Sequence, residues 1–119
     1  MADIDLASFR PGNASELLDG ILSTAVSTAL DQGAKLKATI SADLKALSIA
    51  AFGTQARLAA GEIDQSEADF LLHMQELNLN SILLKLQFLT YALAQAVLDA
   101  VFAVIRAAVR NLTGFDLNF

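Results

Sequence analysis

The chain has 119 residues, of which 55% are hydrophobic and 18% charged; it carries a formal net charge of −5, one histidine and no cysteine. This length fits one domain, and we expect a single domain over residues 1–119. The hydrophobic content excludes intrinsic disorder, and the lack of cysteine excludes disulfides, thiolate metal sites and cysteine nucleophiles. The negative charge argues against nucleic-acid binding, because phosphate contacts need a basic face.

The first residues predict a short extended segment that ends in a turn. Asp3 and Asp5 interrupt any apolar run there, so we expect no cleavable signal peptide. Two cellular locations therefore remain open: the cytoplasm, or the outside of the cell after export by a route that needs no signal peptide. Residues 10–13, Arg-Pro-Gly-Asn, predict the turn, and Asn13 or Ser15 is then the expected cap of the first helix.

One long helix is predicted over residues 14–60. No proline follows Pro11, and apolar or small residues recur at steps of three and four, which is typical of one helical face. Gly33 interrupts this pattern at a cost of about 1 kcal/mol relative to alanine, so we expect a kink near it. Gly61 suits the left-handed position that follows a helix end.

A second long helix is predicted over residues 65–112. Asp64 and Glu67 have the spacing of a capping box, and Gly114 can end the helix. Two helices of roughly 45 residues, or ~70 Å each, joined by a short turn predict an antiparallel hairpin. The expected fold is therefore all-α: an antiparallel two-helix hairpin of long helices with short extended termini.

Small residues suggest a register for this hairpin. If the turn is centred near residues 62–63, Ala29 faces Ala96 and Gly33 faces Ala92, and such pairs allow close approach of two helices. A chain rich in alanine also produces such matches by chance.

The second predicted helix is apolar around most of its circumference. We expect one stripe, which includes Phe70, Leu77 and Leu84, to face the first helix. The other stripe is then left in water, at a cost on the order of 20 kcal/mol, so further copies of the chain are expected to cover it. The predicted subunit-interface residues on this stripe are Leu79, Leu83, Leu86, Leu93, Val97, Val101 and Val104.

Apolar and polar residues alternate at both ends of the chain, a period of two that is typical of strands. We expect the two ends to pair as a small ribbon or to add as strands to neighbouring subunits; frayed tails are the third alternative. The predicted interface residues in these segments are Ile4, Leu6, Phe9, Phe115, Leu117 and Phe119.

No pattern in the sequence predicts catalysis. His73 shares a helical face with Asp69 and Glu76, but the Glu-x-x-His motif of di-iron bundles is absent. No Gly-x-Ser-x-Gly elbow and no glycine-rich phosphate loop occur. We expect no enzymatic activity, no metal ion and no cofactor.

Two functions remain open on these grounds. The first is a structural subunit that self-assembles through apolar helix faces and strand-like termini into a filament, tube or closed oligomer, although a different partner chain fits the same pattern. The alternative is an amphipathic protein that coats a lipid or granule surface, with peripheral lipid contact. A transmembrane span is not expected, because the longest run without charge, residues 86–98, is shorter than the about 20 residues that a spanning helix needs.

Overall fold

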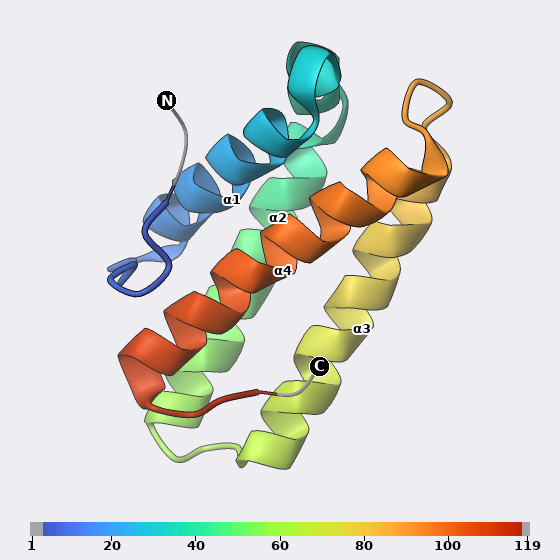
Figure 1. Ribbon diagram of the computed structural model, residues 1–119. Helices are drawn as coiled ribbons and strands as arrows, with labels where there is room; N and C mark the ends of the chain where they lie inside the picture. The colour runs from blue at the N-terminus through green and yellow to red at the C-terminus, as the bar shows by residue number, and fades with distance from the viewer. Residues whose placement is uncertain (1–3, 118–119) are drawn as a thin grey trace.

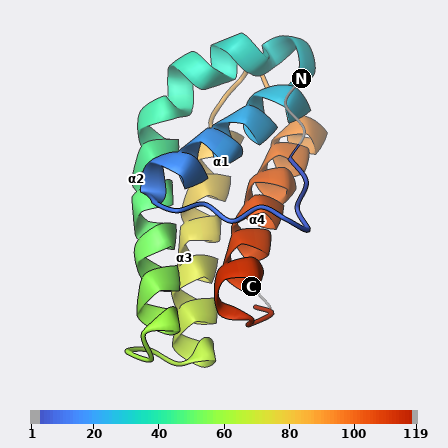
Figure 2. The ribbon, with the colours of Figure 1, turned by 90° about the vertical axis from the view of Figure 1, so that its left-hand side faces the viewer.

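The computed structural model describes residues 4–117 and forms a bundle of four α-helices. They are α1 (Ala14–Thr28), α2 (Gly33–Ala59), α3 (Gln65–Leu84) and α4 (Tyr91–Thr113), with a single 3-10 turn, η1 (Leu30–Gln32), between α1 and α2. Successive helices run in opposite directions, α1 and α3 packing on either side of α2 and α4 (Figures 1 and 2). The all-α prediction is confirmed.

The predicted two-helix hairpin is wrong, because each predicted long helix is divided in two. The segment 14–60 turns back at η1, and the segment 65–112 turns back over residues 85–90. The expected kink near Gly33 is therefore a full reversal. Four shorter helices can cover one another's apolar faces, whereas two long ones leave most of that surface in water.

The first reversal depends on two unusual positions. Leu30 adopts the left-handed conformation, with φ of 58°, at the place after a helix end that glycine normally occupies. Its side chain is 74% exposed, so little packing offsets the backbone cost. Gly33 starts α2 so close to α1 that a Cβ there would lie 2.6 Å from the carbonyl oxygen of Val26. Only glycine fits this contact without a shift of the backbone.

The second reversal uses neither glycine nor proline. Lys85 and Leu86 donate backbone hydrogen bonds to the carbonyls three residues before them, which tightens the end of α3. Thr90 then caps α4, since its hydroxyl accepts a hydrogen bond from the backbone N–H of Leu93 at 3.1 Å. Leu89 is buried and holds the connection against the core.

The other helix ends lie where capping chemistry predicts them. Asn13 caps α1 through its side-chain oxygen, and Asp64 caps α3 by accepting the N–H of Glu67 at 2.8 Å. Gly61 and Gly114 adopt the left-handed conformation, with φ of 75° and 82°. These local predictions are confirmed.

The predicted register of small residues is wrong at one end. Ala92 and Ala96 are exposed, so they do not pack against Ala29 and Gly33. Gly33 approaches Val26 of α1 instead, because α2 turns back onto α1. The reversal at η1 therefore replaces the expected pairing.

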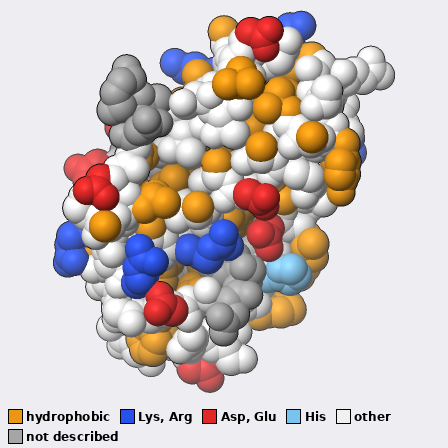
Figure 3. Space-filling model, viewed as in Figure 1, with side chains coloured by type: hydrophobic (Ala, Val, Ile, Leu, Met, Phe, Trp, Pro, Cys, Tyr) orange, Lys and Arg blue, Asp and Glu red, His pale blue; other side chains and the backbone are white. Residues whose placement is uncertain are grey.

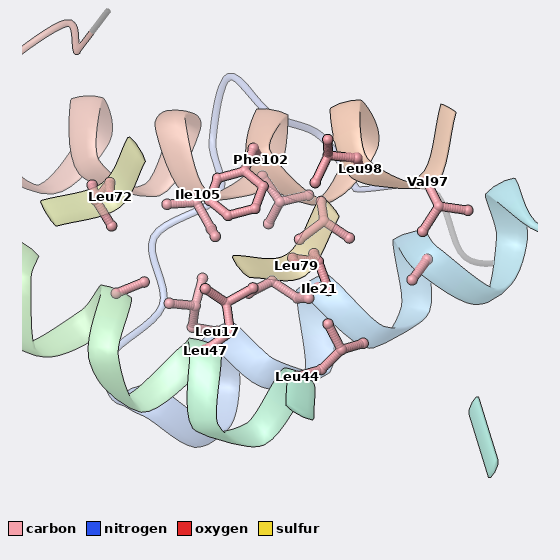
Figure 4. Packing of buried hydrophobic residues seen from close by; sticks show 14 of the residues in the cluster. Leu17, Ile21, Leu44, Leu47, Leu72, Leu79, Val97, Leu98, Phe102 and Ile105 are labelled. Atoms are coloured by element: carbon pink, nitrogen blue, oxygen red, sulfur yellow. The ribbon is translucent and has the colours of Figure 1, made fainter. Parts of the chain in front are cut away.

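α4 contacts α1, α2 and α3, and it has the largest share of buried residues among the four helices. Its largest fully buried side chain, Phe102, lies at the centre of the core, and with Ile105 it points toward the α1 side chains Leu17 and Ile21 (Figure 4). The neighbouring helices add Leu44, Leu47, Leu72 and Leu79 to the same cluster. The chain itself thus covers the helix for which coverage by other copies was predicted.

The first reversal gives a paired prediction. Gly33→Ala is expected to lower the free energy of unfolding by about 1–3 kcal/mol, because the new methyl group meets the Val26 carbonyl. Gly53→Ala is the control, since a Cβ at this position in α2 meets nothing within 4 Å; it should stabilise the protein by roughly 0.5–1 kcal/mol. Urea unfolding followed by circular dichroism measures both, and equal stabilisation by the two variants would contradict the tight turn.

The cap at the second reversal predicts whether Thr90→Ala raises or lowers the free energy of unfolding. Loss of the hydroxyl cap should lower the free energy of unfolding by about 1 kcal/mol, whereas Thr90→Ser keeps the acceptor and most of the stability. In one continuous helix over residues 65–112, the same alanine would be stabilising, because alanine has the highest helix propensity. Thermal unfolding of the two variants distinguishes these cases.

Candidate functional site

The predicted interface residues on the helices lie in or against the core of their own chain. Leu79, Leu83, Val97, Val101 and Val104 are buried, and Leu86 and Leu93 are partly buried against the same cluster. Their burial within one chain removes the argument that further copies must cover them.

The N-terminal segment is held on the bundle by Asn111 of α4. The side-chain amide of Asn111 donates to the carbonyl oxygens of Leu6 and Phe9, both at 2.9 Å, and Arg10 donates to the Asn111 carbonyl. Phe9 and Ile4 are partly buried against α1; a Cβ at Gly20 would lie 2.6 Å from the Phe9 ring. Leu6 is exposed.

The C-terminal segment lies on its own chain as well. Leu117 is buried, and the side-chain amide of Gln65 donates to the carbonyl of Asp116 at 2.8 Å. Phe115 is exposed, and the predicted contact of Phe119 lies outside the described residues. No strand forms within residues 4–117, so the predicted ribbon is wrong for this part of the chain. Of the two apolar side chains described here, Leu117 is buried and Phe115 is not, so the alternation does not mark one side that faces the bundle.

Large apolar side chains remain exposed along the outward face of α3. Phe70, Met74, Leu77 and Leu84 are each between 48% and 62% exposed. Their spacing of four, three and seven residues places them in one line about 21 Å long. In Figure 3, hydrophobic side chains gather along the right-hand edge over α3, above and below the histidine. We call these four residues the α3 apolar face.

The two apolar stripes of this segment are interchanged relative to the prediction from the sequence. Phe70, Leu77 and Leu84 were expected to face the first helix, yet they are exposed, whereas Leu79 and Leu83 were expected to be uncovered, yet they are buried. Both stripes are apolar at helical spacing, so periodicity alone does not distinguish them. Ser81, which lies in line with the α3 apolar face, is the one sequence signal that favours exposure of this stripe.

Two exposed charges flank the α3 apolar face on the side of α2. Glu67 lies near the start of the helix and Lys85 at its end, both about 60° around the helix from Phe70. Neither side chain forms an ion pair within residues 4–117. The acidic group therefore lies at one end of the face and the basic group at the other.

The opposite flank, on the side of α4, is held by local hydrogen bonds. His73 Nδ1 lies 3.2 Å from Glu76 Oε1 within α3, and Asn80 accepts a hydrogen bond from Gln95 of α4 at 2.9 Å. These contacts order the edge of the α3 apolar face without covering it.

The described residues assemble no cluster suited to metal or acid–base chemistry. No three His, Asp or Glu side chains of the part 4–117 gather at one point. A cavity of about 250 Å³ between α1 and α4 is lined by hydrophobic and hydroxyl-bearing side chains, among them Leu6, Thr24 and Ala103. No charged side chain among residues 4–117 lines it.

Comparisons with protein-family models, curated proteins and solved structures find no match for this chain. By length and composition alone, α4 could cross a membrane. The core helix of a bundle meets the same criterion, and 56% of the most apolar 18-residue stretch of α4 is buried inside this bundle. The candidate site therefore follows from exposure and charge, which select the α3 apolar face.

The contacts of Asn111 predict the effect of removing its side chain. Asn111→Ala should lower the free energy of unfolding by about 1–2 kcal/mol and speed hydrogen exchange of residues 4–13, because two carbonyl oxygens lose their donor. Asn80→Ala is the control, since it removes an amide contact between helices elsewhere. Equal exchange of residues 4–13 in both variants would show that Asn111 does not hold the segment.

Proposed function

We propose that this protein is a non-enzymatic structural subunit that associates with copies of itself through the α3 apolar face. The observation that carries the proposal is the alignment of Phe70, Met74, Leu77 and Leu84 in one exposed line, on a bundle that buries its other large apolar stripes. Contiguous apolar surface of this kind typically marks a site of protein association.

The size of the face limits the affinity. Four half-exposed side chains offer on the order of 400 Å² per chain, about half of the ~800 Å² per partner in a stable interface. The remainder has to come from polar flanks, whose contribution per unit area is smaller. We therefore expect a dissociation constant in the micromolar range, not a permanent oligomer.

The alternative, coating of a lipid or granule surface, would use the same apolar face. Interfacial helices usually carry lysine and arginine beside their apolar side. Here α3 carries the acidic residues Glu67, Asp69 and Glu76, against the single basic residue Lys85 at its end. With a net charge of −5 for the chain, this arrangement favours a protein partner over an anionic membrane.

Sedimentation velocity over a concentration series tests the proposal. The wild-type protein should shift from the 12.6 kDa monomer to a larger species at micromolar concentration, and Leu77→Lys should abolish the shift, because it puts a charge into the centre of the face. Ile49→Lys is the matched control: Ile49 is also exposed, but it lies on α2. Its association should equal that of the wild type.

A flotation assay with vesicles of neutral and anionic lipid separates the alternative. If the protein stays monomeric up to millimolar concentration and floats with the vesicles, self-association is overturned and surface coating is the better proposal. Equal loss of association in Leu77→Lys and Ile49→Lys would show that the α3 apolar face is not the contact.

A further inference from the structure

We propose that two copies of the chain pair antiparallel through α3, with a two-fold axis beside Leu77. This inference rests on the proposed function and specifies its geometry. A single self-complementary face closes on itself when two copies meet, so the product is a closed dimer and not a filament.

The α3 apolar face is nearly symmetric about its centre. Phe70 and Leu84 lie seven residues before and after Leu77, so an antiparallel pair centred there brings Phe70 against Leu84 of the partner subunit. Met74 then faces Ser81 of the partner subunit, a large side chain against a small one. Each of these contacts occurs twice, as two-fold symmetry requires.

The charges on the flank favour the antiparallel arrangement. Around a two-fold axis perpendicular to the helices, the α2 side of one α3 faces the α2 side of the other. Glu67 lies ten residues before Leu77 and Lys85 eight after it, so Glu67 comes within about 3 Å, along the helix axis, of Lys85 of the partner subunit. Both groups are exposed and form no ion pair in the single chain, over residues 4–117.

Parallel pairing of the same faces lacks these contacts. Its two-fold axis runs along the helices, so the α2 side of one α3 faces the α4 side of the other, and neither Glu67 nor Lys85 meets an opposite charge at its own level. The helix dipoles would also point the same way, whereas in the antiparallel pair they oppose each other favourably. Charge thus selects one direction of pairing for a face whose apolar content would allow both.

Cross-linking tests the direction, because the natural chain has no cysteine. With a short bis-maleimide, Leu77→Cys is expected to link to itself. A mixture of Phe70→Cys and Leu84→Cys should give a linked dimer, whereas neither of these variants should link alone. Self-linking of Phe70→Cys would indicate parallel pairing and overturn the proposal; Ile49→Cys, on α2, should remain unlinked.

Charge reversal tests the contact between Glu67 and Lys85. Glu67→Lys and Lys85→Glu should each raise the dimer dissociation constant roughly tenfold, because each puts two like-charged pairs into the dimer. The double variant should recover wild-type affinity, since both pairs are restored with exchanged signs. Glu62→Lys, outside α3, should leave the affinity unchanged. Circular dichroism confirms that each variant keeps its helix content.

The failure of this inference can be told apart from failure of the proposed function. A wild-type chain that stays monomeric at all concentrations overturns both. A chain that associates and loses association in Leu77→Lys, but shows neither mixed cross-linking nor charge rescue, overturns only the antiparallel dimer.

Discussion

The structure depends on the removal of α4 from water. This helix has apolar residues on nearly every side, and three neighbouring helices of the same chain enclose it around Phe102 and Ile105. A hairpin of two long helices cannot do this, since a single partner covers one side of a helix. Each half of the chain therefore turns back once, and the resulting bundle buries within one molecule what two long helices would expose.

The two reversals are the local consequences of that constraint. Leu30 accepts a left-handed backbone conformation that costs about 1–2 kcal/mol, and the segment before Thr90 interrupts a sequence of good helix formers. Both costs are small beside the burial of a whole helix face, which is worth on the order of 10 kcal/mol or more. Packing between distant segments thus decides where helices end when local propensity favours continuation.

With α4 enclosed, the surplus apolar surface lies on the outside of α3, where we propose that the protein associates. The α3 apolar face is narrow, lies on one side of the bundle and carries opposite charges, Glu67 and Lys85, at its two ends. A face of this kind offers a limited, directional contact, whereas an apolar helix exposed on all sides would aggregate without a preferred direction. Self-association through α3 is consistent with both its size and its charge.

The sequence alone predicted the helical class, the caps at Asn13 and Asp64, and the left-handed conformation of Gly61 and Gly114. Caps and turns can be predicted in this way because they depend on residues that are neighbours in the sequence. The number of helices and the orientation of the stripes on α3 could not. Two stripes of similar hydrophobicity have the same period, and only contacts between residues far apart in sequence decide which one is buried. The tertiary structure therefore decided that Leu79 and Leu83 face the core and that Phe70 and Leu77 face water.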